Sequence, residues 1–203
     1  MEPIVAVVLS YLSGSIPFAA IAGKLRNVDL RKHGSGNLGA TNVFRVLGWK
    51  IGLLVFVADA AKGALPVYYL PPRIVSPSEP VLWAIACGIA AIAGHVRPIF
   101  LKLRKGGKGV ATAAGVFFAL APMAMAVTFV VFVVVVFATG YVSLGSMLSA
   151  LVLPTLLLVT LGARSPMFLV SVVIALFVFW THRSNIGRLR RGEEHRFGKG
   201  GSV

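Results

Sequence analysis

Apolar runs of about 20 residues recur from one end of the sequence to the other, and they constrain the fold more than any other feature. A helix needs roughly 20 residues to cross the hydrocarbon core of a bilayer. Hydrophobic residues make up 57% of the chain and charged residues only 13%, against roughly 25% charged in soluble domains. The sequence therefore predicts an all-α integral membrane protein. The predicted spans are 3–23, 51–70, 81–100, 142–161 and 166–181.

One apolar stretch, residues 110–138, is too long for a simple span and is interrupted by Pro122. Proline inside a helix kinks or breaks it. The stretch therefore forms one kinked helix, two short helices, or a re-entrant hairpin.

Positive charge is concentrated in three connecting segments, which carry 17 of the 20 lysines and arginines. Segments rich in these residues stay in the cytoplasm, which places the N-terminus outside. For the C-terminus to be cytoplasmic too, the chain must turn back near Pro122. We therefore predict about seven transmembrane helices, with the fourth and fifth short; five spans plus a re-entrant hairpin is the alternative. The basic segments are 24–50, 97–108 and 183–199.

The predicted spans leave no room for a separate soluble domain. Residues 1–203 are expected to form one membrane domain, with 198–203 as a disordered tail or a linker. The first span lacks the basic segment of a signal peptide and is expected to be retained. Cys87 is the only cysteine, so neither an internal disulfide nor a thiolate metal cluster is available. We expect no metal, no cofactor and no nucleic-acid partner.

Three glycine-rich, cation-bearing stretches, residues 35–45, 94–112 and 182–193, connect the apolar spans. Glycine-rich backbone beside Arg or Lys commonly holds phosphate. All three fall on the predicted cytoplasmic face, so they can converge on one site. For cations without glycine or amide neighbours, the alternative is attraction to anionic lipid head groups, worth about 1 kcal/mol each. These cations are Arg26, Arg31, Lys32, Arg190 and Arg191.

The second and third stretches both carry residues that can bind an anion. Residues 105–109 read KGGKG, but Lys102 and Gly109 occupy positions where a Walker A motif needs Gly and Ser or Thr, which disfavours nucleotide hydrolysis. If helix continues past the last span, His182 and Asn185 lie at i and i+3 and can address one ligand.

Two ionisable residues, Asp59 and Lys62, lie inside the second span at i and i+3. Such residues are costly in a membrane and are usually paired or functional, so we predict a structural salt bridge. The chain has only six carboxylates, which disfavours a two-carboxylate mechanism or a hard-metal cage. No histidine is followed five residues later by aspartate, so the common His-x4-Asp acyltransferase dyad is absent.

The order of these motifs resembles the bacterial family of glycerol-3-phosphate acyltransferases that use acyl-phosphate donors, over nearly the whole chain. The matching segments are SGNLGATN with Arg45, GHVRPIF followed by GGKGVAT, and HRSNIGRLRRGE. DAAKG at 59–63 resembles the family's short motif in the second span. The segment 103–105 departs from the family's aromatic-rich approach to GGKG, which bears on donor preference.

The resemblance implies that acyl phosphate and sn-glycerol 3-phosphate give 1-acyl-glycerol 3-phosphate and inorganic phosphate, at the cytoplasmic face of the bacterial plasma membrane. The fatty tail would lie in a groove between apolar helices, and the expected partners are the lipid bilayer and a soluble enzyme that makes acyl phosphate. A mixed anhydride is already activated, so positioning and oxyanion stabilisation suffice. The alternatives are a membrane transporter of phosphate or a phosphorylated metabolite, and a structural protein that clusters anionic lipids.

Residue chemistry and the family pattern together give a hypothetical site. Lys108, His95 and Ser35 are the candidate catalytic residues; the general base is either His95 or the acceptor's own phosphate. The phosphate of glycerol 3-phosphate is assigned to Arg45, Lys108, His182 and Asn185, and its hydroxyls to Ser35, Asn37, Thr41 and Asn42. Acyl phosphate is assigned to Gly106, Gly107, Lys108, Gly109, Thr112 and Ser143.

Overall fold

The structure is a computed structural model that describes residues 1–74 and 79–197. The described part contains helices and turns and no strand. The chain divides into two compact units, Met1–Leu120 (unit 1) and Ala121–Val203 (unit 2), and each is described by itself. The predicted tail, 198–203, lies outside the described residues.

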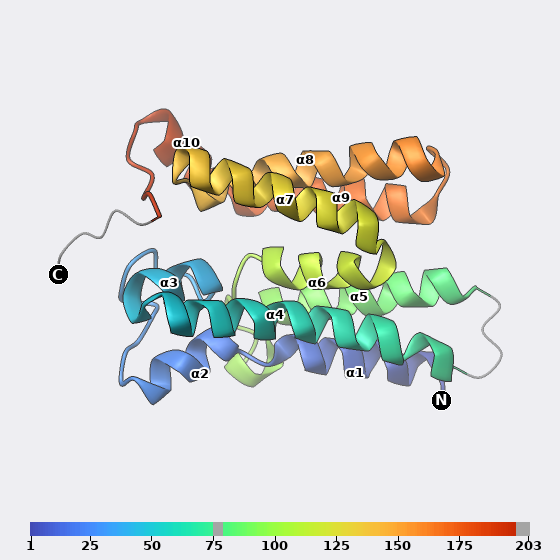
Figure 1. Cartoon of the computed structure of the whole chain (residues 1–203). Helices are drawn as coiled ribbons and strands as arrows, with labels where there is room; N and C mark the ends of the chain where they lie inside the picture. The colour runs from blue at the N-terminus through green and yellow to red at the C-terminus, as the bar shows by residue number, and fades with distance from the viewer. Residues whose placement is uncertain (75–78, 198–203) are drawn as a thin grey trace. The chain divides into compact units, whose positions relative to one another are not determined.

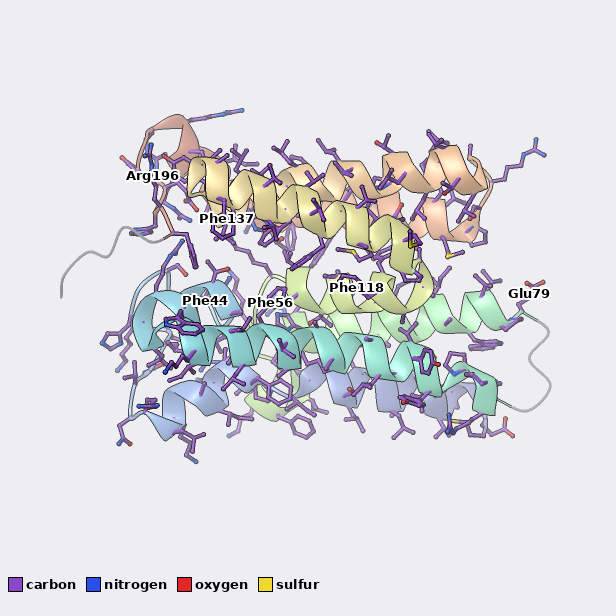
Figure 2. All side chains as sticks on the ribbon, viewed as in Figure 1. Phe44, Phe56, Glu79, Phe118, Phe137 and Arg196 are labelled. Atoms are coloured by element: carbon purple, nitrogen blue, oxygen red, sulfur yellow. The ribbon has the colours of Figure 1, made fainter. Side chains whose placement is uncertain are left out.

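In unit 1 the helices α1, α4, α5 and α6 pack against one another, and the short helices α2 and α3 lie at one end (Figure 1). Figure 2 marks its ends: Phe44 lies at the end that carries the short helices, and Glu79 lies at the opposite end. The elements are α1 (Pro3–Ser15), α2 (Phe18–Leu25), α3 (Ala40–Leu47), α4 (Trp49–Tyr69), the 3-10 turns η1 (Pro71–Arg73) and η2 (Ile99–Leu101), α5 (Pro80–Val96) and α6 (Val110–Leu120).

Unit 2 is a bundle of three long helices in which α8 packs against both α7 and α9. Its tail folds back: the N–H of Phe197 donates to the Gly140 carbonyl, and Arg196 Nε donates to the Tyr141 hydroxyl at 3.1 Å. Figure 2 shows Arg196 and Phe137 at this same end of the unit. The elements are α7 (Pro122–Thr139), α8 (Val142–Leu161), α9 (Pro166–Thr181) and α10 (Arg183–Arg190).

Five helical segments of the described part are long and apolar enough to cross a membrane, and α9 with α10 makes a sixth if that bent pair is one span. The chain is thus a multi-pass membrane protein. Large apolar side chains lie on the outer faces of these helices, where lipid replaces water as the solvent. The helix α6, at 11 residues, is shorter than a span. The total of seven and the orientation of the termini stay predictions.

The first predicted span, residues 3–23, lies within one candidate span, Pro3–Leu25, and the helix is interrupted inside it. Helix α1 ends at Ser15 and α2 begins at Phe18, because Pro17 cannot donate a backbone hydrogen bond. At the break the Ile16 carbonyl accepts a hydrogen bond from the Phe18 N–H at 3.2 Å, and Lys62 Nζ also donates to it at 2.7 Å. The proline that the prediction passed over therefore creates a polar point inside the first span.

The stretch 110–138 is also broken, and of the three predicted forms the structure contains two helices. Helix α6 ends at Leu120, and Pro122 opens α7 at a position where its missing N–H costs nothing. The first of the two is short, as predicted. The second, α7, has 18 residues and is long enough to span.

Small residues let the helices of unit 1 approach closely. A Cβ on Gly14 would lie 2.0 Å from the Ala91 carbonyl oxygen, at the contact between α1 and α5. A Cβ on Gly115 would lie 1.9 Å from the Ala60 oxygen, at the contact between α4 and α6. Close backbone approach through small residues is the usual way in which membrane helices pack. It places α4 and α5, and the polar residues they carry, firmly within unit 1.

Candidate active site

The first glycine-rich stretch is organised by the side chain of Asn42, which is 1% exposed. Its Oδ1 accepts a hydrogen bond from the Ser35 N–H at 2.8 Å, and its Nδ2 donates to the carbonyls of Leu30 and His33 at 3.0 and 3.1 Å. A Cβ on Gly34, which has φ +61°, would lie 2.3 Å from Oδ1. Asn42 therefore holds the loop, and its amide is engaged with the backbone rather than presented to a hydroxyl of glycerol.

The second half of this stretch forms the helix α3, which the sequence prediction missed. Thr41 and Arg45 lie on α3, and both are partly buried. Asn37 precedes the helix, and its buried Oδ1 accepts no hydrogen bond from the part of the chain that the structure describes. The role of Asn37 in binding glycerol 3-phosphate stays a prediction.

The second stretch packs against the first. A Cβ on Gly107 would lie 2.1 Å from His95 Nε2 and 2.9 Å from the Leu38 carbonyl oxygen. A Cβ on Gly106 would lie 2.1 Å from the His95 carbonyl oxygen, and the Gly106 N–H donates to Val96 at 2.9 Å. These two glycines are needed for close packing, and the Gly106 N–H is engaged within the loop rather than turned to acyl phosphate.

The loop then leads into α6. Gly109 has φ +83°, a left-handed conformation that favours glycine. Lys108 is partly buried between these glycines. Thr112 is fully buried, and a Cβ on Gly63 would lie 3.0 Å from its Cγ2, so this side chain packs against α4. Its hydroxyl has no hydrogen-bond partner among the described residues.

A buried charged cluster lies next to this loop. Asp59 Oδ1 lies 2.7 Å from Lys62 Nζ, which is the ion pair that the spacing predicted, and 3.5 Å from His95 Nδ1. The three side chains line a small cavity together with Ile16, Leu38 and Gly107. The cavity thus joins the broken first span to both glycine-rich stretches of unit 1.

In unit 2, the carboxylate of Glu194 gathers three side chains of the third stretch and of α8. Its Oε1 accepts from Ser143 at 2.8 Å and from Asn185 Nδ2 at 2.6 Å, and its Oε2 accepts from Arg188 at 2.7 Å. Burial raises the pKa of the Glu194 carboxyl, but the hydrogen bonds from Asn185, Ser143 and Arg188 outweigh burial, so the pKa lies below its ordinary value.

Glu194 is the residue that sequence reasoning missed. An acidic pair that follows a run of arginines reads as solvated charge, and the two members differ: Glu193 is exposed and pairs with Arg191, whereas Glu194 is buried. Ser143, which was assigned to acyl phosphate, donates to Glu194 in the structure.

His182 lies at a 56° bend between α9 and α10, because the helix does not continue straight past Thr181. The ring is buried, and Nδ1 lies 2.8 Å from the Val178 carbonyl oxygen. A carbonyl can only accept, so Nδ1 carries the proton. His182 and Asn185 are thus both buried at the start of α10.

The site residues offer cations, amides and glycine backbone, and few bases. Among residues 1–74 and 79–197, no three His, Cys, Asp or Glu side chains gather closely enough to hold a metal ion. The arrangement suits the binding of phosphate groups and the stabilisation of an oxyanion by preorganised donors.

Comparison with known proteins gives a consistent result. The description of the family Glycerol-3-phosphate acyltransferase matches residues 4–192. A protein of Trichlorobacter lovleyi named glycerol-3-phosphate acyltransferase is 46% identical over 190 residues, which cover 93% of this chain and 94% of the relative. A Bacillus cereus protein named glycerol-3-phosphate acyltransferase 2 is 44% identical over 184 residues, covering 90% and 88%.

Solved structures agree. The crystal structure of PlsY (YgiH), an integral membrane glycerol 3-phosphate acyltransferase, in its glycerol 3-phosphate form, has a TM-score of 0.87 and 39% identity, covering 97% of this chain and 96% of that one. The form with lysophosphatidic acid has a TM-score of 0.83. The match spans nearly the whole chain and includes all three glycine-rich stretches, so this membrane protein belongs to the glycerol-3-phosphate acyltransferase family.

Proposed function

We propose that this enzyme transfers a fatty acyl group from acyl phosphate to sn-glycerol 3-phosphate, giving 1-acyl-glycerol 3-phosphate and inorganic phosphate. The observation that carries the proposal is the contact of Gly107 with Leu38, which joins two glycine-rich, cation-bearing stretches far apart in the sequence. The relatives named for this activity, and the neighbours solved with glycerol 3-phosphate and lysophosphatidic acid, support it.

The reaction needs little chemistry from the protein. The primary hydroxyl of glycerol 3-phosphate attacks the acyl carbonyl carbon, the new ester bond forms, and the bond from that carbon to the phosphate oxygen breaks. Phosphate leaves with the electron pair, and the hydroxyl proton passes to a base. The acceptor's own phosphate, whose second pKa is about 6 by analogy with other phosphomonoesters, is a suitable base. Positioning two anions is then the main task of the enzyme.

The residue roles follow from chemistry and the family pattern. Arg45 supplies a planar fork and Lys108 an ammonium group for phosphate, both in unit 1. Asn37, with its buried amide oxygen, would accept a hydrogen bond from a glycerol hydroxyl. In unit 2, His182 and Asn185 would donate to phosphate. Further proposed contacts are Ser35 and Thr41 for glycerol 3-phosphate, and the backbone of Gly107 and Gly109 for acyl phosphate.

The proposal extends to the cellular setting. In unit 1 the segments 24–50 and 97–108 carry 11 of the cations, and Glu79 lies at the end opposite to Phe44 (Figure 2). This distribution supports an active site at the cytoplasmic face of the bacterial inner membrane. The fatty tail would lie among apolar helices, where each buried methylene contributes about 0.8 kcal/mol. A soluble enzyme that makes acyl phosphate would supply the donor.

Purified protein in detergent tests the reaction directly. Inorganic phosphate should be released from acyl phosphate only when glycerol 3-phosphate is present, and acyl-CoA and acyl carrier protein should not replace the donor. Lys108→Ala should abolish turnover, whereas Lys105→Ala, an exposed lysine of the same loop, should retain most of it. Phosphate uptake into proteoliposomes without ester formation would instead indicate a transporter.

A further inference from the structure

Three ionisable side chains, Asp59, Lys62 and His95, are buried together in unit 1, with exposed fractions of 2%, 4% and 6%. Asp59 contacts both of the others, Lys62 at 2.7 Å and His95 at 3.5 Å. Ionisable groups inside membrane segments are costly and mark functional positions. A salt bridge needs only Asp59 and Lys62, so it does not account for the burial of the third side chain, His95.

The His95 ring touches the substrate-binding loop directly. Its Nε2 edge lies against Gly107, where an added Cβ would come within 2.1 Å. The next residue, Val96, also contacts this loop: its carbonyl accepts a hydrogen bond from the Gly106 N–H. His95 therefore supports, from inside the unit, the two residues that immediately precede Lys108.

The cluster is anchored at its far end by the broken first span. Lys62 Nζ donates to the Ile16 carbonyl at 2.7 Å, and the Ser13 hydroxyl donates to the Lys62 carbonyl at 3.1 Å. A continuous series of contacts thus runs from α1 through Lys62 and Asp59 to His95 and the loop. Between Asp59 Oδ1 and His95 Nδ1 the contact is a 3.5 Å approach without a hydrogen bond among the described residues, so close packing and charge orient the ring, as supporting residues do in other active sites.

We propose that His95 is a positioning residue that, held by Asp59 and Lys62, fixes the loop 106–109 and so places Lys108 for the phosphate of the acceptor. The proposal rests on the proposed function only for the role of Lys108. It assigns no proton transfer to His95. One ring nitrogen faces Asp59 and the other faces Gly107, and these two neighbours fix the orientation of the ring.

Conservative substitution separates positioning from proton transfer. His95→Gln fills the place of the ring with a planar amide that cannot act as a base near neutral pH. It should retain most of kcat, whereas His95→Ala should raise the KM for glycerol 3-phosphate about tenfold. If His95→Gln lost as much kcat as His95→Ala, while KM stayed at its wild-type value in both, His95 would be the base and the proposal would be wrong.

Adjacent glycines supply a matched control. The new methyl group of Gly107→Ala collides with the His95 ring, so part of its effect on KM should disappear when His95→Ala removes the ring. The rest of the effect should persist, because the same methyl group also collides with the Leu38 carbonyl oxygen. Gly106→Ala collides with the His95 backbone oxygen, so its effect should be the same in both backgrounds. Equal, additive effects for both glycines would show that the ring does not set the loop position.

Hydrogen exchange gives a readout that does not depend on the reaction. The Gly106 amide is protected by its bond to Val96, and His95→Ala should speed exchange in the loop 102–109 while the rest of unit 1 keeps its protection. Unchanged exchange would overturn the proposal even in an active enzyme. If the wild-type protein formed no ester, the proposed function would fail, but faster exchange would still support the positioning role.

Discussion

Asn185 and Glu194 are joined by a 2.6 Å hydrogen bond, in which the amide Nδ2 donates to Oε1. Ser143 donates to the same oxygen, and Arg188 donates to the other. One carboxylate thus fixes the start of α8 and two residues of α10. Since Asn185 is a proposed phosphate ligand, Glu194 determines how that ligand is presented.

Removing the Glu194 carboxylate should destabilise the protein. Glu194→Ala leaves three donors without their acceptor, and each buried unsatisfied group costs about 1–3 kcal/mol. We expect a clearly lower unfolding temperature in detergent. Glu193→Ala is the matched control, because that exposed carboxylate pairs with the exposed Arg191 and should contribute about 0–1 kcal/mol. Equal shifts for the two variants would contradict the structure.

The stability contributed by Glu194 should depend on pH. Its pKa in the folded protein is lowered, so the ionised form stabilises the fold near neutral pH, and this stabilisation is lost as the pH falls below the ordinary glutamate pKa of about 4.3 and through the folded value. Glu194→Gln imitates the protonated side chain. The difference in unfolding temperature between wild type and Glu194→Gln should be largest near neutral pH and shrink on acidification; a constant difference would be inconsistent with the lowered pKa.

Two asparagines of the first stretch should behave differently. Asn42→Ala removes three hydrogen bonds that hold the loop, each worth about 1 kcal/mol, and should lower stability by about 2–3 kcal/mol. Asn37→Ala removes an amide oxygen that has no partner among the described residues, so it should leave stability unchanged and raise the KM for glycerol 3-phosphate. Thermal unfolding and steady-state kinetics on both variants test this contrast, and a stability loss only in Asn37→Ala would reverse the assignment.

Removing one partner of the buried ion pair on α4 should lower the stability of the protein more than removing both partners. Lys62→Met leaves Asp59 buried without its main counter-charge, which typically costs about 3–5 kcal/mol. Asp59→Asn combined with Lys62→Met removes both charges and should recover much of that loss. Unfolding temperatures of the single and double variants give the coupling energy, and additive losses would argue against a direct pair.

Much of the fold could be predicted from the sequence because apolar length is a strong signal. The spans that became α4, α5, α8 and α9 lie within a few residues of their predicted ends. The break near Pro122 was predicted as well, since proline interrupts a helix. Pro17 gives the same signal and separates α1 from α2, but Pro3–Leu25 still makes one candidate span, so the predicted span 3–23 is confirmed.

The site was harder to predict, because its residues act through contacts distant in sequence. Helix α3 was missed because glycine and small polar residues favour loops, whereas burial of Val43 and its neighbours stabilises the helix. The roles of Asn42 and Glu194 depend on acceptors and donors from other segments, which no local pattern indicates. The glycines at 106 and 107 are predicted to bind acyl phosphate through their backbone, and the structure shows that close packing against His95 also requires them.

The carbonyl of Ile16 has a consequence for biogenesis, because the shorter of its two hydrogen bonds comes from Lys62, which is translated much later. A nascent chain that ends before Lys62 would leave this carbonyl with the 3.2 Å bond from the Phe18 N–H, and one that contains Lys62 would carry a charge that needs the same carbonyl. We therefore expect the first two hydrophobic segments to leave the translocon as a hairpin, not singly. Truncated nascent chains with engineered glycosylation sites would reveal this, since lone first segments should integrate less completely than pairs.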